Sequence, residues 1–194
     1  INNEKKIALQ QIKDDFIRMI YHCWEVERLP LTSRTAVLTL LHKGGDKENL
    51  MNYRPISLIN VDYKLLTYVF ANRLQSVLGD LIHTDQTGYI QGRYIGCSVR
   101  NIIDLFEYCE NKSISGALLS IDFEKAFDSL EKKFMIAALD KFNFGQGFKK
   151  WVNIFYRDNK LKVKNNGWIS EPFDMTRGVK QGCPLSALLF IIAI

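Results

Sequence analysis

An apolar run that ends in a carboxylate is the feature that most constrains this chain. Residues 116–121 read GALLSI, a pattern typical of a buried strand, and the next residue is Asp122. Burying an unpaired carboxylate costs several kcal/mol. The strand is therefore expected to end either at an edge that reaches solvent or at a site that holds a hard cation, and this segment alone leaves both interpretations open.

A second acid, Asp128, follows in the same stretch, SIDFEKAFDSL. Asp128 and Glu131 form an Asp-x-x-Glu pattern before residues with helical periodicity, which is typical of a capping box. The pattern predicts that Asp128 caps the next helix rather than taking part in chemistry.

The remaining periodicity predicts a mixture of helices and hairpins without a regular strand–helix alternation, which indicates an α+β fold. A strand is expected over 35–43, and Asn166-Gly167 is the strongest hairpin signal in the chain. Apolar faces are expected at Ile102, Leu105 or Phe106, and Cys109, and at Leu130, Phe134, Ala138 and Phe142. The expected helices cover roughly residues 4–28, 63–78, 98–110, 130–142 and 147–157, and a further helix begins at Pro184.

Composition narrows the class of protein only mildly. The net charge of +5 and the pI near 9.0 favour polyanionic partners. The four cysteines lack the spacing of a zinc site and the density of a disulfide scaffold, so a reducing compartment is expected. No apolar run reaches the ~18 residues of a membrane helix, and no membrane association is expected.

A glycine-rich turn carries a second candidate site. The stretch TRGVKQGCPLSALLF (176–190) places Gly178 and Gly182 around Lys180 and Gln181. Glycines at these positions permit the close approach of a backbone or a nucleobase, and an amide side chain can donate and accept at once. A plain glycine loop before a helix is the alternative interpretation.

Four segments in order resemble the motifs of one enzyme family. SIDFEKAFDSL is similar to motif A, and GVKQGCPLSALLF to motif B, of reverse transcriptases from non-LTR retrotransposons (long interspersed elements). NYRPISLINVDYKLLTYVFANRLQ (52–75) and DQTGYIQGRYI (85–95) resemble the two fingers motifs of these enzymes. The resemblance implies a right-hand polymerase, with an N-terminal extension and fingers over residues 1–112 and the first part of the palm over 113–194.

The resemblance also implies a reaction. It is the magnesium-dependent transfer of deoxynucleoside triphosphates onto a DNA primer, copied from an RNA template, as in target-primed retrotransposition. By its match to motif A, Asp122 would be the catalytic ligand of a two-metal site, because magnesium takes oxygen ligands and needs few carboxylates. Phe127, with Phe123 beside it, would lie at the incoming sugar, where a ring excludes a 2′-hydroxyl. An ordinary core residue is the alternative interpretation for Phe127.

The basic and turn residues receive roles by the same match. Arg54 and Lys64 are expected to reach the triphosphate, and Gln181 the nascent base pair. Residues assigned to the template or primer are Arg73, Arg93, Arg177, Lys180 and Gly182; surface arginine without function is the alternative for Arg73 and Arg93.

Two departures from the family pattern bear on activity. Ala187 stands where many relatives have a second proline. Motif C, which supplies the remaining metal carboxylates, does not occur, so the chain is expected to be an inactive piece of a protein with further domains. A group II intron-type enzyme, or a decayed or co-opted remnant that only binds RNA, are the alternative interpretations.

Overall fold

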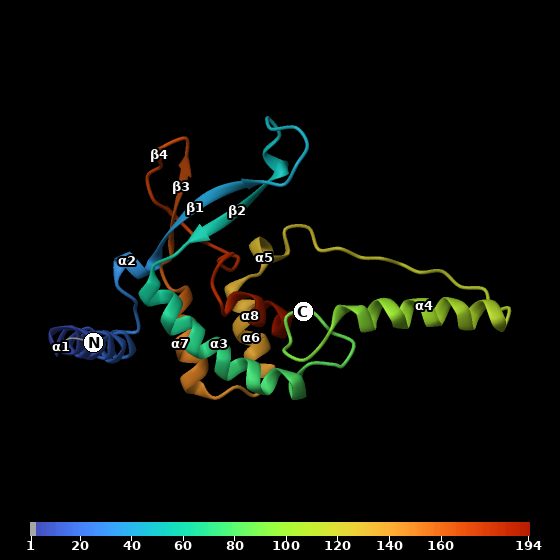
Figure 1. The fold of residues 1–194 in the computed structure, drawn as a ribbon, viewed down its shortest axis with the longest axis horizontal. Helices are drawn as coiled ribbons and strands as arrows, with labels where there is room; N and C mark the ends of the chain where they lie inside the picture. The colour runs from blue at the N-terminus through green and yellow to red at the C-terminus, as the bar shows by residue number, and fades with distance from the viewer. Residues whose placement is uncertain (1–2) are drawn as a thin grey trace.

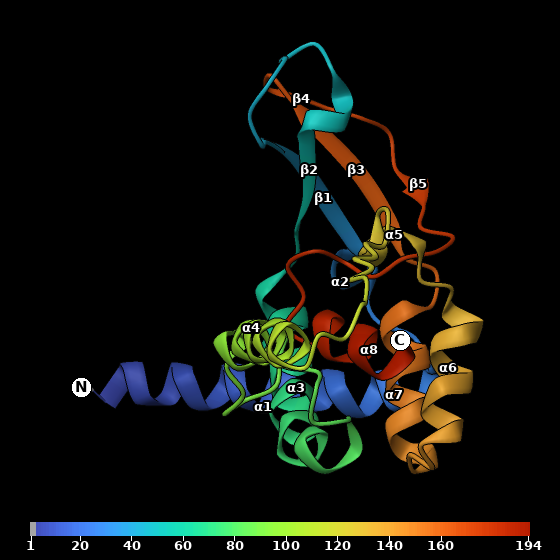
Figure 2. The ribbon, with the colours of Figure 1, turned by 90° about the vertical axis from the view of Figure 1, so that its right-hand side faces the viewer.

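A five-stranded sheet stands above a group of helices in the computed structural model, which describes residues 3–194 and the side chains from Gln10 onward (Figures 1 and 2). The main path of the sheet runs β2-β1-β3-β4, and β5 also pairs with β3. β1 pairs with β2 antiparallel and with β3 in parallel. The strands are β1 (Thr35–His42), β2 (Tyr53–Leu58), β3 (Lys160–Asn165), β4 (Trp168–Ile169) and β5 (Phe173–Asp174).

Two sequence predictions in this sheet are confirmed, the strand over 35–43 and the hairpin around Asn166-Gly167. β1 covers nearly all of the expected 35–43 run, and β3 and β4 form the hairpin around Asn166-Gly167. Asn166 and Gly167 have φ values of 48° and 85°. Two successive residues in the left-handed region are what a tight hairpin turn requires, so this turn chemistry fixes the register of β3 against β4.

The helices agree with the predicted pattern within a few residues. The mixture of helices and a mostly antiparallel sheet is the α+β architecture expected from the sequence. The helical segments are α1 (Asn3–Val26), α2 (Leu31–Arg34), η1 (Leu50–Asn52), α3 (Val61–Leu81), α4 (Ile95–Asn111), α5 (Ala126–Ser129), α6 (Lys132–Lys141), α7 (Gln146–Tyr156) and α8 (Ser186–Ala193).

Aromatic side chains tie α1, α3 and α7 together in the core. Phe70 on α3 lies 5.5 Å from Trp151 and 5.3 Å from Phe155 between ring centroids, and both partners belong to α7. Trp24 of α1 packs on Trp151 at 5.6 Å. Each such pair adds about 0.5–1.5 kcal/mol beyond its buried area. The aromatic contacts therefore fix the platform on which the sheet stands.

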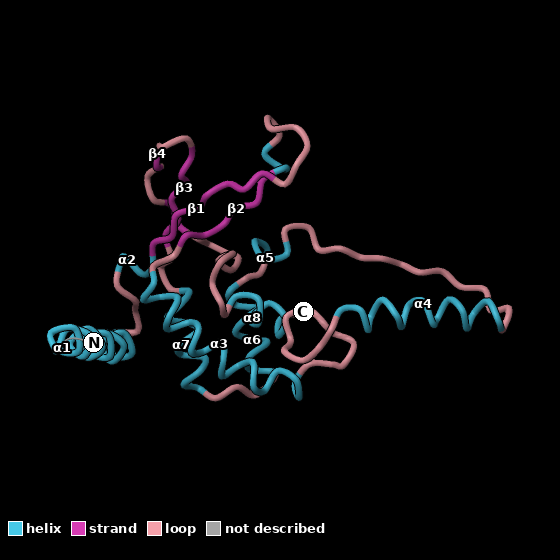
Figure 3. The backbone as a smooth tube through the Cα atoms, viewed as in Figure 1, coloured by secondary structure: helices cyan, strands magenta, loops and turns pink. Residues whose placement is uncertain are grey.

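The predicted strand ending at Asp122 does not form. After α4, residues 112–123 run back to α5 as an extended segment without strand pairing, visible as the long loop in Figure 3. Leu118, Leu119 and Ile121 are exposed. A strand needs a hydrogen-bonding neighbour, and none of the described strands pairs with this segment.

The helix α4 forms as predicted, but its apolar face is not buried. Ile102, Leu105 and Phe106 are exposed, and α4 has no buried residue. Figure 1 shows why: α4 projects away from the other helices. The amphipathic spacing therefore predicted the helix correctly, but the burial of its apolar face was predicted wrongly. Periodicity does not say whether another element is present to cover that face.

The buried face of α6 is also shifted from the predicted one. Met135 and Leu139 are buried, whereas Phe134 and Phe142 are exposed. Leu130 is buried and Ala138 packs against the core, so the predicted face is correct at these two positions and wrong at Phe134 and Phe142. The division into fingers (1–112) and palm (113–194) stays a prediction. β3, which follows residue 112, pairs with β1, which precedes it.

Candidate functional site

The glycine-rich turn meets two other motif segments at once. The amide of Gly178 donates to the carbonyl of Leu130 at 2.7 Å, and the amide of Val179 donates to that of Phe127 at 2.8 Å. On the other side, the amide of Ser57 on β2 donates to the carbonyl of Gln181 at 2.7 Å. The turn thus joins the segment of motif A to the first fingers motif through backbone hydrogen bonds.

Both glycines of this turn are required by geometry. Gly178 has φ +84°, and a Cβ atom there would lie 2.9 Å from the carbonyl oxygen of Asp128. Gly182 has φ +124°, and its Cβ would lie 2.7 Å from the carbonyl oxygen of Ser57. An L side chain is strained at these φ values and would also collide with backbone, so the close approach predicted from the sequence is confirmed.

Asp128 does not cap the following helix. The N-cap of α6 is Glu131, which makes no side-chain cap hydrogen bond, and Asp128 lies inside the short helix α5. Its carboxylate oxygen accepts a hydrogen bond of 3.3 Å from the side-chain amide of Gln181. The capping prediction is therefore wrong, because the chain turns into α5 before α6 begins and the acid serves a contact distant in sequence.

A small cavity of about 230 Å³ lies beside this turn. Its walls come from the sheet, from Asp128 and from residues 177–181 of the turn. The sheet residues that line it, Leu38, Pro55, Ser57 and Leu161, belong to one face of β2, β1 and β3.

Phe127 is half-buried and held from both sides. Its ring stacks on Phe190 of α8 with centroids 5.0 Å apart, and Tyr89 approaches edge-on at 6.4 Å. Phe123 is 62% exposed. The structure thus fixes the ring predicted to lie at the sugar, and leaves Phe123 without comparable support.

Lys180 is buried, contrary to the surface position that a phosphate contact requires. Its ammonium donates to Asn159 Oδ1 at 3.2 Å and lies 4.2 Å from the centroid of the Tyr63 ring. Only 1% of the residue is exposed. Burial lowers the pKa of this ammonium to about 8, with a smaller contribution from nearby Lys132. Lys180 therefore anchors the turn to α3 and to the residue before β3.

Arg93 also has a structural role in place of the predicted template contact. Its guanidinium donates to four backbone carbonyls, those of Gly79, Ile82, His83 and Gln86, at 2.5 to 2.9 Å. These carbonyls belong to the end of α3 and the loop after it. The donors of Arg93 are thus used within the protein, where they close the end of the helix.

The other predicted cationic residues lie on the surface. Arg54 on β2, Lys64 and Arg73 on α3, and Arg177 in the turn segment are exposed. None of the ion pairs within the described part of the chain involves them. They are accessible to an anion, and the structure does not bring them together in one pocket.

Asp122 stands apart from other metal ligands. It lies in the exposed extended segment before α5. Within the described residues, no group of three or more His, Cys, Asp or Glu side chains could hold a metal ion. The described residues therefore do not form a two-magnesium site by themselves.

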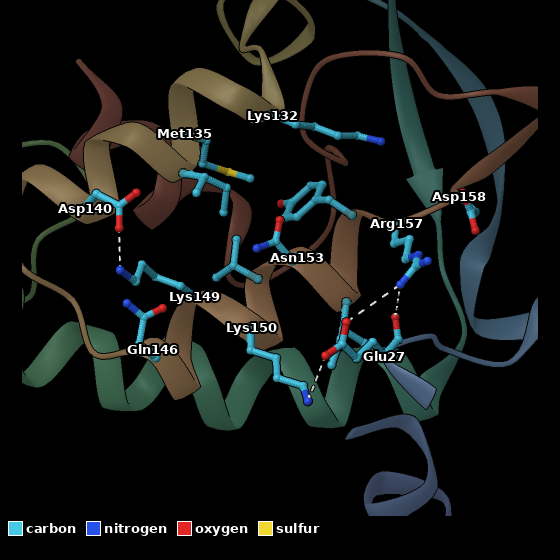
Figure 4. Close-up of a pocket in the computed structure, with 14 residues that line it drawn as sticks. Glu27, Lys132, Met135, Asp140, Gln146, Lys149, Lys150, Asn153, Arg157 and Asp158 are labelled. Atoms are coloured by element: carbon cyan, nitrogen blue, oxygen red, sulfur yellow. Dashed lines mark hydrogen bonds and ion pairs between the residues drawn. The ribbon is translucent and has the colours of Figure 1, made fainter. Parts of the chain in front are cut away.

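A larger cavity, of about 860 Å³, lies elsewhere in the molecule (Figure 4). It is bordered by α6, α7 and the end of α1. Most of its charged side chains are paired: Lys150 and Arg157 pair with Glu27, and Lys149 pairs with Asp140, whereas Lys132 forms no ion pair with the described residues. No residue predicted for the site lines it, and its paired charges offer little to a ligand.

Sequence reasoning missed Tyr63, Asn159 and Ser57 as supports of the turn. Tyr63 and Asn159 lie far from residue 180 in sequence, and no local pattern marks them. Burial raises the pKa of the Tyr63 hydroxyl well above its usual range. The ring therefore stays neutral while it faces the ammonium.

The glycine-rich turn is held between β2 and the segment that follows Asp122, so three segments that resemble motifs of one family meet in the structure. The profile of the reverse transcriptase (RNA-dependent DNA polymerase) family matches residues 42–194. The chain belongs to this family.

The relatives of the chain are proteins of non-LTR retrotransposons. It is 39% identical over 180 residues to the transposon TX1 uncharacterized 149 kDa protein of Xenopus laevis, covering 93% of this chain and 14% of that protein. It is 31% identical to the Pol polyprotein of the type-2 retrotransposable element R2DM of Drosophila melanogaster, covering 84% and 15%. A type-1 element R2 protein of Popillia japonica is 30% identical, with 78% and 21% covered.

The chain thus spans about a seventh to a fifth of the length of these relatives. In the described part of the chain, no helix combines the length and the apolar character that crossing a membrane requires.

Proposed function

We propose that this chain is the fingers and the first part of the palm of an RNA-directed DNA polymerase of a non-LTR retrotransposon. The reaction is the transfer of deoxynucleotides onto a DNA primer copied from an RNA template, as in target-primed retrotransposition. Convergence of three motif segments at residues 178–182 is the observation that carries the proposal. Family membership and the names of the relatives support it.

In this proposal the residues of the turn shape the place where a new base pair forms. Gln181 is held between Ser57 and Asp128, so its position is fixed relative to both fingers and palm segments. Phe127, clamped by Phe190, is a steric barrier to a 2′-hydroxyl, and Phe123 is the neighbouring contact. Arg54 and Lys64 bind the triphosphate, while Arg73, Arg177 and the backbone of Gly182 contact template or primer.

Asp122 is proposed as one carboxylate of a magnesium site. Because the described residues do not complete that site, its other ligands are proposed to come from parts of the protein outside them. The polymerase is also proposed to be joined to further domains, since the relatives are several times longer.

The test is primer extension by a longer chain of this protein that includes the rest of the palm. With an RNA template, a DNA primer, magnesium and deoxynucleotides, extension is expected, and Asp122→Asn should reduce it by at least about 1,000-fold, the order expected when a metal-bound charge is lost. Asp140→Asn, on the surface of α6, is the matched control and should retain activity. A fully active Asp122→Asn variant contradicts the catalytic role.

The 194 residues alone are expected to give no extension. If the longer chain is inactive but binds RNA in a salt-sensitive way without metal, the activity proposed here is wrong and RNA binding is what remains.

A further inference from the structure

The residue just before Gln181 is a buried lysine whose charge has no counter-ion. Lys180 is buried, and within the described residues it forms no ion pair. Its ammonium meets two neutral groups instead, the amide oxygen of Asn159 and the face of the Tyr63 ring. Removing a charge from water toward neutral groups costs free energy that a methionine of similar length would not cost. Stability alone therefore does not account for a charged side chain at this position.

The two groups that receive the ammonium are themselves held by one residue near the end of α7, Phe155. The side-chain amide of Asn159 donates to the carbonyl of Phe155 at 2.9 Å, which leaves its oxygen for Lys180. The Tyr63 ring packs edge-on against the Phe155 ring, with the centroids 5.9 Å apart. We call Tyr63, Asn159 and Lys180 the lysine cluster. Because its two neutral members are buried and fixed, the place of the ammonium is fixed as well.

Asn159 holds the segment of the turn at two points. Its backbone carbonyl accepts a hydrogen bond of 2.9 Å from the amide of Met175, and its side-chain oxygen accepts one from Lys180. Met175 is the residue directly after β5, and the residues between these two points lead into the turn. The path of the chain up to Gln181 is therefore set by a single residue that precedes β3.

Gln181 lies between two attachments of the turn to the core, Lys180 before it and Cys183 after it. The thiol of Cys183 donates to the Tyr63 hydroxyl at 3.9 Å, so this second attachment also reaches the lysine cluster. The side chain of Gln181 itself donates to Asp128. A shift of Lys180 would move the backbone of Gln181, and its side chain would move with it.

From these contacts we infer that Tyr63 and Asn159 are positioning residues of the polymerase, which act through the Lys180 ammonium to fix where Gln181 meets the nascent base pair. Both are about 1% exposed, so they act through the turn and not on the substrate. An ammonium can be held at once by a ring face and an amide oxygen from different elements, whereas an apolar side chain has no preferred direction in the same space. The place of Gln181 at a base pair rests on the proposed function; the lysine cluster rests on the contacts above.

The first test uses the 194-residue chain and needs no catalysis. The amide of Ser57 donates to the carbonyl of Gln181, so its hydrogen exchange reports whether the turn is held. In Lys180→Met, measured by NMR at pH 7, this amide should exchange about fivefold faster than in the original chain, as for one weakened hydrogen bond. The amide of Leu74, inside α3, should not exchange faster, because it reports the stability of the whole fold.

The second test measures nucleotide addition by the longer polymerase. Lys180→Met should raise the KM for the correct deoxynucleotide about tenfold and change kcat by less than about twofold. A displaced Gln181 weakens the binding of the nucleotide, whereas the groups that hold the metal are unaffected. Incorporation of mismatched deoxynucleotides should rise relative to matched ones for the same reason.

Tyr63→Phe and Tyr63→Leu are the matched pair for the ring. Phenylalanine keeps an aromatic face at the ammonium and should keep the original KM and the original exchange of the Ser57 amide. Leucine removes that face and should reproduce the effects of Lys180→Met, as should Asn159→Ala, which removes the amide oxygen. Lys133→Met removes an exposed lysine of α6 and should change neither quantity.

The thermal midpoint of each variant establishes that it is folded, and the Tyr63 pair gives the same comparison if Lys180→Met does not fold. Unchanged exchange of the Ser57 amide in Lys180→Met overturns the inference. Equally faster exchange at Ser57 and Leu74 also overturns it, since Lys180 would then support the fold alone, as does an unchanged KM. If the unaltered longer chain extends no primer, the proposed function fails, and exchange at Ser57 still decides whether the lysine cluster holds the turn.

Discussion

At the scale of single residues, Gly178 holds the closest backbone approach between the two palm motifs. Gly178→Ala should lower the free energy of unfolding by about 2–4 kcal/mol. Part of this loss is the cost of a positive φ for alanine, and the rest comes from contact with the carbonyl oxygens of Asp128 and Phe127, both within 3.0 Å of the new Cβ. Urea unfolding measures the difference.

Gly147→Ala is the control for Gly178→Ala. Gly147 lies in α7, and a Cβ there meets only the rim of the Trp24 ring at 3.9 Å. Alanine is favoured over glycine inside a helix, so this variant should be as stable as the original chain or up to about 1 kcal/mol more stable. A Gly178→Ala variant that behaves like Gly147→Ala contradicts the close approach.

The buried ammonium of Lys180 should give the chain a distinctive pH dependence. Its pKa in the folded protein is about 8, below the ordinary value of 10.5 expected for the unfolded chain. Between these values the unfolded chain binds more protons, so stability rises with pH. Relative to Lys180→Met, which cannot titrate, the unfolding free energy of the original chain should increase by about 2 kcal/mol from pH 8 to pH 10.

Denaturant unfolding at closely spaced pH values tests the effect of Lys180. Lys133→Met removes an exposed lysine instead and should keep the pH dependence of the original chain. A parallel pH dependence in the original chain and in Lys180→Met means that the ammonium is not buried in solution.

Phe127 should determine which sugar is accepted. In the longer polymerase, Phe127→Val should raise the ratio of ribonucleotide to deoxynucleotide incorporation by about tenfold or more, because a smaller side chain leaves room for the 2′-hydroxyl. The control is Phe190→Leu, which removes the stacking partner without opening the sugar position, and should affect stability more than discrimination. Unchanged discrimination in Phe127→Val would remove the assignment.

At the scale of elements, Arg93 holds the loop between α3 and α4. Arg93→Ala should lower the unfolding free energy by about 2 kcal/mol and raise hydrogen exchange in residues 82–93, since four carbonyls lose a charged donor. Arg73→Ala, on the exposed side of α3, should change stability by less than about 0.5 kcal/mol. Equal effects of the two substitutions would show that the four hydrogen bonds are weak.

Local sequence signals predicted which helices and turns form better than they predicted what these elements pack against or pair with. The Asn166-Gly167 turn and the helical repeats depend on neighbouring residues, and each formed as expected. Burial of the α4 face and pairing of residues 116–121 depend on a second surface, which sequence periodicity does not describe. Asp128 shows the same limit, since its partner, Gln181, is distant along the chain and replaces a local cap.

In the candidate site, the two glycines of the turn lie as predicted, whereas two of the predicted cationic residues make contacts within the protein. Gly178 and Gly182 were expected to allow close approach, and they do. The resemblance implies that Lys180 and Arg93 contact the template or primer, but a lysine or arginine can be enclosed when a ring, an amide or several carbonyls surround its charged group. Contacts of this kind are set by the whole fold and leave no local trace.

At the scale of the whole molecule, the sheet is what joins the beginning of the chain to its end. β1, from the first part of the chain, pairs with β3, from the second part. The turn at 178–182 lies against β2. The resemblance alone divides the chain at residue 112. The structure adds that the fingers sheet and the motifs after that residue support each other, so neither part is expected to fold well without the other.

The parallel pairing of β1 with β3 has a consequence for synthesis. Thr35 pairs with Lys160, so about 125 residues must be made before β1 obtains this neighbour. At about 5–20 residues per second, a ribosome needs roughly 6–25 seconds for that stretch. During that time β1 has an uncovered edge, the kind of surface that pairs with other chains. The interval in which a nascent copy is most open to aggregation is therefore built into the order of its strands.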